Sequence, residues 1–343
     1  MSIADFGLYR QVADLANVVG VGYGKKTIRG KDTNRKAVVV LVKEKIEKKK
    51  LERSSYIPKN LAGLPTDVIE VGDIRLLNNR IEIMRPAKPG ISIGHYKVSA
   101  GTFGAVVYDK KTSEPLILSN NHVLANLTNG DDGRAQTGDA ITQPGLYDSE
   151  NGNLEELTIG YLEKFIPLHL EWIAPQCKIA QFFERIINKI INTVKPQYQI
   201  RVLRESEKAN LVDCAVAKPI RPELIQPAVL DIGEIKGSQA PSVGMKIKKS
   251  GRSSGLTHSM IIATDVTIRI NINNRETGLF TDQVLAGPMS LPGDSGSLIV
   301  TDDNNGDNYG VGLLFAGSEQ ATLFNKIDHV LQTLNVTLTN KEE

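Results

Sequence analysis

Residues 291–297 read LPGDSGS and place a serine in a glycine-rich turn directly before the apolar stretch 298–300. Gly293 lets the backbone turn so that its own N–H and that of Ser295 point into one small space. Two such N–H groups can hold the oxyanion of a tetrahedral intermediate in acyl transfer. The turn therefore predicts Ser295 as a nucleophile, with Gly293 and Ser295 as oxyanion donors.

A serine hydroxyl needs a base to activate it and a third group to orient that base. Residues 115–124 (PLILSNNHVL) form a short apolar strand that ends in polar residues and delivers His122 at its exit. Residues 210–217 (NLVDCAVA) embed Asp213 in an apolar run, where an unpaired charge would be costly. Each residue alone also fits an ordinary turn, cap or buried carboxylate, but together they predict a triad.

The chain order His122, Asp213, Ser295 separates the folds that share this chemistry. It is the order of the chymotrypsin-like enzymes, whereas subtilisin-type and α/β-hydrolase enzymes order their triads differently. The α/β-hydrolase turn also requires Gly-x-Ser-x-Gly, and Ser297 occupies its last position here. The order therefore favours a chymotrypsin-like fold.

Three separate segments resemble those of trypsin-like serine proteases of the disulfide-free, intracellular kind. Residues 118–126 (LSNNHVLAN), 249–257 (KSGRSSGLT) and 292–297 (PGDSGS) are similar to a group that includes bacterial peptidases and the plant protein Narrow leaf 1. The resemblance covers about residues 86–335. It implies a mainly β, two-barrel chymotrypsin-like fold that works without a cofactor or a metal. Ser295 would then attack the acyl carbon, with His122 as base and Asp213 fixing its tautomer.

Substrate-binding residues also follow from the resemblance. The position six before the nucleophile, where trypsin keeps an aspartate, is Met289, so a preference for Lys or Arg is not expected. Residues 310–317 (GVGLLFAG) would be the strand that pairs with substrate backbone, with Phe315, Ala316 and Gly317 at the rim of the side-chain pocket.

The length of 343 residues leaves room for more than the two barrels. Residues 1–85 alternate strand and helix patterns and predict a small N-terminal α+β module without chemistry of its own. Residues 86–343 then form the protease domain, with a helical insertion at about 170–200.

The insertion contains an amphipathic helix at 177–194, in which apolar residues recur at steps of three and four. Pro196 ends it. The pattern fits burial against the same chain, a subunit contact or lid, or binding to a membrane surface.

The composition bears on which partners and which cell compartment the protein is expected to have. A net charge of +2 with interspersed signs does not suggest nucleic acid. Two cysteines, Cys177 and Cys214, and no leader or long apolar span predict a reducing cytoplasm and no stable membrane insertion.

The turn at 250–258 either binds a ligand carboxylate through Arg252 or is a tight interstrand loop.

The sequence thus predicts a cytoplasmic serine endopeptidase that acts on protein or peptide substrates through an acyl-enzyme. A homo-oligomer is a further expectation. Two alternatives stay open: a catalytically silent, peptide-binding scaffold with a protease fold, and an esterase that uses the same triad.

Overall fold

The computed structural model divides the chain into two units, Met1–Leu77 and Asn78–Glu343. The sequence places this boundary a few residues later, at 85. The structure describes residues 6–15, 17–28, 31–46, 48–51, 55–72, 79–97, 100–149, 152–173, 175, 177–206, 208–272, 276–303 and 306–340.

The N-terminal unit is a small sheet with a short helix. Its sheet order is β1-β2-β4-β3, in which β2 runs parallel to β4 and antiparallel to β1. Alternation along β2 places Val38 and Val40 on one face, where they pack with Leu8 and Val12. The elements are α1 (Phe6–Arg10), β1 (Val18–Ile28), β2 (Lys31–Val42), the 3₁₀ turn η2 (Lys48–Lys50), β3 (Asn60–Leu61) and β4 (Leu64–Glu70).

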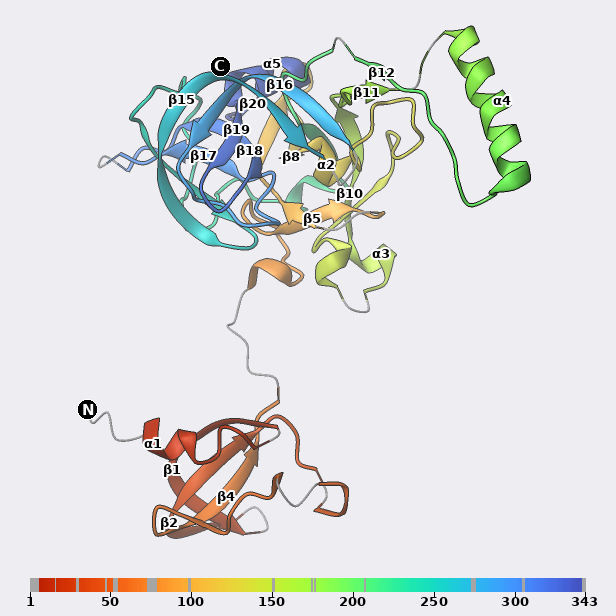
Figure 1. Cartoon of the computed structure of the whole chain (residues 1–343). Coiled ribbons are helices and arrows are strands. Elements are labelled where there is room, and N and C mark those ends of the chain that lie inside the picture. The colour runs from red at the N-terminus through yellow and green to blue at the C-terminus, as the bar shows by residue number, and fades with distance from the viewer. Residues whose placement is uncertain are drawn as a thin grey trace. The chain divides into compact units, whose positions relative to one another are not determined.

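The second unit is mainly β, as predicted (Figure 1). Its first half is an eight-stranded sheet in the order β20-β7-β8-β13-β10-β9-β5-β6. In chain order these strands are β5 (Ser92–His95), β6 (Gly101–Thr102), β7 (Ala105–Asp109), β8 (Pro115–Ser119), β9 (Ala140–Thr142), β10 (Thr158–Phe165), β13 (Ala215–Pro219) and β20 (Val336–Thr337).

The second half is a closed six-stranded barrel in the order β14-β15-β16-β19-β18-β17, closed by pairing of β17 with β14. Closure gives each strand of the barrel a neighbouring strand on both sides. The strands are β14 (Lys246–Gly251), β15 (Gly255–Asn271), β16 (Thr277–Ala286), β17 (Leu298–Thr301), β18 (Gly310–Gly317) and β19 (Thr322–Lys326).

A buried apolar cluster joins the two halves. Leu118 from β8 and Cys214 pack with Leu298 from β17 and Leu313 from β18. Burial, reinforced by the neighbouring Asp213, raises the pKa of the Cys214 thiol well above its ordinary value. Cys214 therefore stays neutral and acts as a small apolar side chain.

The helices of the second unit are short, except α4. They are α2 (Asn121–Leu124), α3 (Leu154–Leu157), α4 (Lys178–Val194) and α5 (Ile327–Leu334), with 3₁₀ turns η4 (Asn79–Ile81), η5 (Leu146–Asp148) and η6 (Pro222–Leu224).

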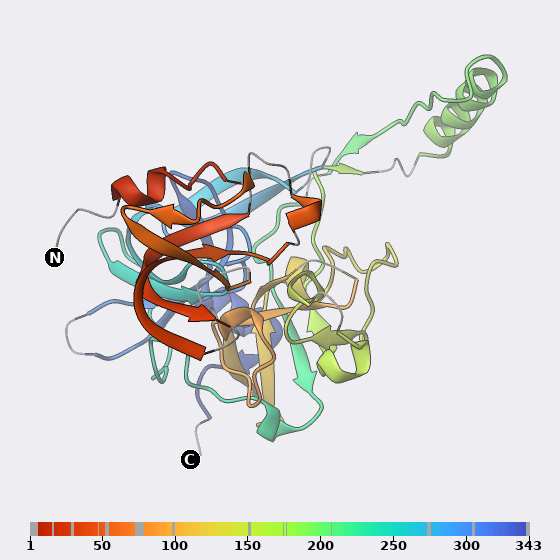
Figure 2. The ribbon, with the colours of Figure 1, turned by 90° about the horizontal axis from the view of Figure 1, so that it is seen from below.

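Helix α4 lies at the end of an excursion that leaves and returns through the two-stranded ribbon of β11 (Trp172–Ile173) and β12 (Arg204–Glu205) (Figure 2). No residue of α4 is buried, so burial against the same chain is not what its apolar pattern serves. None of the helices in the described part of the chain is both long and apolar enough to cross a bilayer.

Candidate active site

Neighbouring strands bring His122 and Asp213 together. His122 lies in α2, just after β8, and Asp213 lies just before β13, which pairs with β8. His122 Nδ1 is 2.5 Å from Asp213 Oδ2, and the His122 backbone N–H donates to Oδ1 at 3.2 Å. The aspartate therefore holds both the ring and the backbone of the histidine.

Asp213 is itself fixed from behind. Its side chain is 4% exposed, whereas that of His122 is 24% exposed. Its backbone N–H donates to Asn325 Oδ1 at 3.0 Å, and its carbonyl accepts from Asn120 Nδ2 at 2.7 Å. Asn325 in turn donates to Gln283 at 2.6 Å. This network fixes the backbone of Asp213, and with it the position of the carboxylate, while the imidazole of His122 stays partly exposed.

The short strand β6 connects the turn at 291–297, which holds the candidate nucleophile Ser295 and is called the nucleophile turn below, to helix α2, which holds His122. Thr102 N–H donates to the Ser295 carbonyl at 2.8 Å. At the neighbouring Gly101, an added Cβ would lie 3.0 Å from that carbonyl and 2.4 Å from Val123, the residue after His122. Among the described side chains, however, no hydrogen bond joins the Ser295 hydroxyl to His122. Such bonds often tighten only when substrate binds.

The backbone of the turn presents two unused N–H groups. Ser253 Oγ donates to the Pro292 carbonyl at 2.7 Å. In a planar trans peptide the C=O and N–H point in opposite directions, so the Gly293 N–H points away from Ser253. Within the described residues, neither this N–H nor that of Ser295 has an acceptor. The pair is thus available to an oxyanion, and its role as the oxyanion donor stays a prediction.

Glycine is required at position 293 for two reasons. Its φ is +97°, a conformation that side chains disfavour. An added Cβ would also lie 2.1 Å from Arg252 Nη1. Arg252 is held in turn by an ion pair with Asp148 and lies over the Tyr147 ring at 5.5 Å. Arg252 therefore supports the turn, and the interpretation of 250–258 as an interstrand loop agrees with the structure better than a ligand carboxylate does.

A buried ion pair between Lys249 and Asp294 also holds the turn at 291–297. Lys249 Nζ lies 3.1 Å from Asp294 Oδ2, and both side chains are fully buried. Asp294 also accepts from the Leu291 N–H at 2.9 Å and from the Ser253 and Ser254 N–H groups at 2.9 and 3.1 Å. One carboxylate thus ties the turn to the loop after β14.

The pKa of Asp294 reflects these contacts. Burial alone would raise it, but the Lys249 ammonium, the Ser254 hydroxyl and the backbone donors of Leu291 and Ser254 together hold it below the ordinary 3.8. Asp294 is therefore a carboxylate in the folded protein at neutral pH.

A groove of about 640 Å³ lies on the histidine side of the site. Phe315, Ala316 and Gly317 line it with His122 and Asp213, whereas Ser295 is not among its lining residues. Its wall includes the stacked rings of Phe280 and Phe315, with centroids 4.8 Å apart.

Met289 lies elsewhere. It is 5% exposed and packs in the barrel core with Ile247, Val284 and Phe324. Its backbone N–H is held by Thr322 and its carbonyl by Thr257. Its predicted contact with substrate therefore stays a prediction.

Sequence reasoning missed the residues that support the candidate triad: Lys249, Ser253, Asn325 and Asn120. Lys249 and Ser253 lie inside the motif run 249–257 and Asn120 lies inside the run 118–126, so the runs were a signal that these positions matter. Asn325 lies outside both runs and far along the chain from the Asp213 N–H that it binds, and no spacing rule indicates it.

We expect Lys249→Met to destabilise the protein by about 3–5 kcal/mol, because it leaves the Asp294 charge buried and unpaired. The matched control is Lys248→Met on the same strand. Lys248 lies 3.7 Å from Asp302 near the surface, and its loss should cost only about 0–1 kcal/mol. Urea unfolding measures both; equal losses would contradict the assigned role of Lys249.

The depressed pKa of Asp294 also predicts a pH dependence. Its stabilisation is complete above the ordinary aspartate pKa of 3.8 and is lost as the pH falls through the lower folded-state value. The difference in unfolding free energy between wild type and Asp294→Asn should therefore be constant near neutrality and shrink below about pH 4. A difference that grew in acid would contradict this assignment.

Residues 227–337 match the Nal1 C-terminal domain family, which confirms the resemblance to the Narrow leaf 1 group over this part of the chain. A comparison with curated proteins found no match.

Similar solved structures are bacterial serine proteases. Thermobifida fusca protease A is 14% identical, with a TM-score of 0.44, and the match covers 73% of this chain and 98% of that one. Nocardiopsis protease is 13% identical with the same coverage and TM-score. Cellulomonas bogoriensis chymotrypsin is 14% identical, with a TM-score of 0.43 and coverage of 74% and 98%.

The eight-stranded sheet, the closed barrel, and the positions of His122, Asp213 and Ser295 on them give residues 78–343 the two-barrel fold of chymotrypsin-like serine proteases.

Proposed function

We propose that this chain is a serine endopeptidase that cleaves peptide bonds through an acyl-enzyme on Ser295. The carrying observation is the His122–Asp213 pair, in which a nearly buried carboxylate holds Nδ1 of a partly exposed imidazole at 2.5 Å. A neutral histidine held in this way has its Nε2 lone pair available as a general base.

Each step has a residue to carry it. His122 Nε2 takes the proton of the Ser295 hydroxyl as its oxygen attacks the substrate carbonyl, and the N–H groups of Gly293 and Ser295 bind the resulting oxyanion. His122 then gives the proton to the leaving amine, and the acyl group stays on Ser295 until water repeats the sequence. Asp213 orients the imidazole and stabilises the imidazolium that forms.

The groove favours an extended peptide with apolar side chains. The β18 residues Phe315, Ala316 and Gly317 line it, and its other walls include Leu168 and Phe280. An extended chain laid along such a strand can pair through its backbone while the walls receive its side chains. The groove next to the histidine thus supports a peptide substrate more than a small ester.

Active-site labelling tests the proposal. Wild-type protein should react with a fluorophosphonate probe and cleave a peptide library, and Ser295→Ala and His122→Ala should abolish both. Asp213→Asn should lower kcat by about 10⁴-fold, because the amide no longer holds the imidazole in the tautomer that can accept the proton at Nε2. The matched control is His258→Ala, since His258 also contacts an aspartate, Asp302 at 2.8 Å, but lies outside the groove.

An unlabelled, inactive wild-type protein would contradict the proposal and favour the silent scaffold. Labelling without any peptide cleavage would favour the esterase.

Ser253 tests the oxyanion geometry. Ser253→Ala removes the hydroxyl that fixes the Pro292 carbonyl, so the Gly293 N–H loses its fixed direction. We expect kcat to fall by about tenfold, less than the 10²–10³-fold for complete loss of one donor, with little change in KM. Ser253→Thr, which keeps a hydroxyl, should recover most of the rate. A change confined to KM would contradict the role.

A further inference from the structure

Helix α4 presents a wide apolar face to solvent. Phe182, Phe183, Ile186 and Ile190 are between 40% and 61% exposed. Large contiguous apolar patches are rare on the surface of soluble proteins and commonly mark a site of interaction with a protein, a membrane or a ligand. The complete exposed apolar set is Ile179, Phe182, Phe183, Ile186, Ile187, Ile190 and Val194.

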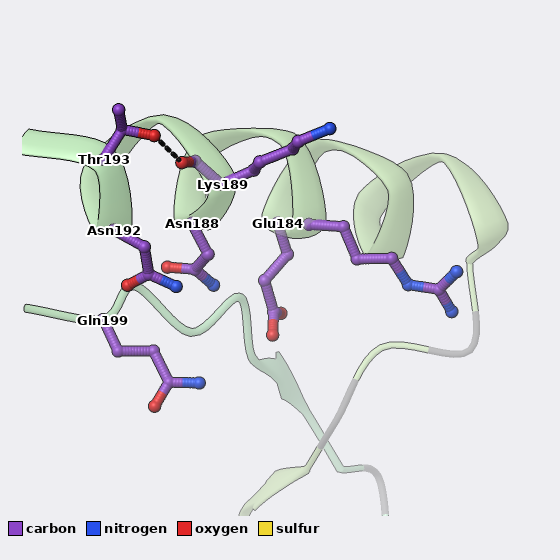
Figure 3. Close-up of a pocket in the computed structure, with 7 residues that line it drawn as sticks. Glu184, Asn188, Lys189, Asn192, Thr193 and Gln199 are labelled. Carbon is purple, nitrogen blue, oxygen red and sulfur yellow. Dashed lines mark hydrogen bonds between the residues drawn. The ribbon is translucent and has the colours of Figure 1, made fainter. Parts of the chain in front are cut away.

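The opposite, polar face is already used by the chain. Asn188 exchanges two hydrogen bonds of 2.8 Å with the backbone of Ile200, and Glu184 accepts from the Val202 N–H at 3.0 Å. Figure 3 shows Glu184 and Asn188 directed at the segment that returns from the helix, on which Gln199 lies. These bonds turn the apolar face outward and fix it there.

Charge identifies the partner. Residues 177–204 contain six basic side chains and a single acidic one, Glu184, for a net charge of +5, although the whole chain carries only +2. Lys178, Arg185 and Lys189 are spaced by seven and four residues, which places them along one flank of the helix, beside the apolar face.

We propose that α4 binds the surface of an anionic lipid bilayer. A strongly amphipathic helix with large apolar side chains on one face and lysine and arginine beside them lies flat at such a surface. Its 17 residues would extend about 25 Å along the membrane plane. The exposed aromatic residues Trp172 and Tyr198, at the two sides of the excursion, are of the kind that settle at headgroup level.

A second copy of this chain fits the face less well. Pairing two helices face to face would bring two segments of net charge +5 together, with one acidic residue each to offset them. That residue, Glu184, is already bonded to the returning backbone. An anionic bilayer supplies the missing negative charge over the whole length of the helix.

Vesicle flotation of the full-length protein tests this. The protein should float at low salt with vesicles of phosphatidylglycerol and phosphatidylcholine in equal amounts, and much less with phosphatidylcholine alone. Binding to the anionic vesicles should weaken as salt is added, because screening reduces the attraction.

Two double variants separate charge from apolar contact. Arg185→Glu with Lys189→Glu should weaken binding at least tenfold, and so should Phe182→Ser with Ile186→Ser. The matched control is Lys110→Glu with Lys111→Glu, which makes the same charge change at an exposed turn of the first sheet and should alter binding less than twofold.

Circular dichroism and thermal unfolding should show that the variants are folded, because the substituted positions are exposed. Failure to float with anionic vesicles would overturn the proposal, and so would equal weakening by the helix and control variants. Sedimentation of the free protein gives the competing outcome: an oligomer that Phe182→Ser with Ile186→Ser converts to a monomer would assign the face to a second copy.

Discussion

The Lys249–Asp294 ion pair is the interaction on which the nucleophile turn depends. Two opposite charges that are both fully buried are stable only when their geometry is good and their remaining hydrogen bonds are made. Here the carboxylate meets that condition by accepting from backbone N–H groups on both the turn and the loop after β14. The need to satisfy one buried charge thus determines where Ser295 stands relative to the barrel.

The same constraint orders the oxyanion donors. The loop that the carboxylate holds contains Ser253, which binds the Pro292 carbonyl, and Arg252, whose guanidinium occupies the space that a Cβ on Gly293 would fill. The shape of the turn therefore depends on the buried Lys249 ammonium, which holds Asp294 and, through it, the loop that carries Ser253 and Arg252. The direction of the Gly293 N–H is set before substrate arrives, which is what electrostatic stabilisation of an oxyanion requires.

The sequence predicted the fold class because local patterns encode it, and the proposed chemistry rests on the same patterns. The apolar run before His122 is β8, and the apolar run around Asp213 leads into β13. The two strands pair with each other, as expected for the fold that the order of the triad residues favours. The supports could not be predicted in this way. Asn325 reaches Asp213 from 112 residues away, and Lys249 reaches Asp294 across 45, so only the folded barrel reveals these contacts.

Helix α4 shows the opposite limit of sequence reasoning. Its periodicity predicted the helix but not what its apolar face contacts, since burial and exposure produce the same pattern. The structure decides by the polar face, where Asn188 and Glu184 satisfy the returning backbone.

The ribbon that carries α4 also begins beside the proposed substrate groove. Glu171 accepts from Thr277 at 2.6 Å and pairs at 2.5 Å with Arg269, which lines the groove. A bilayer that held α4 would thus hold, through one short ribbon, a wall of the groove. Peptide segments close to a membrane surface would then reach His122 at a raised effective concentration without any new contact in the groove.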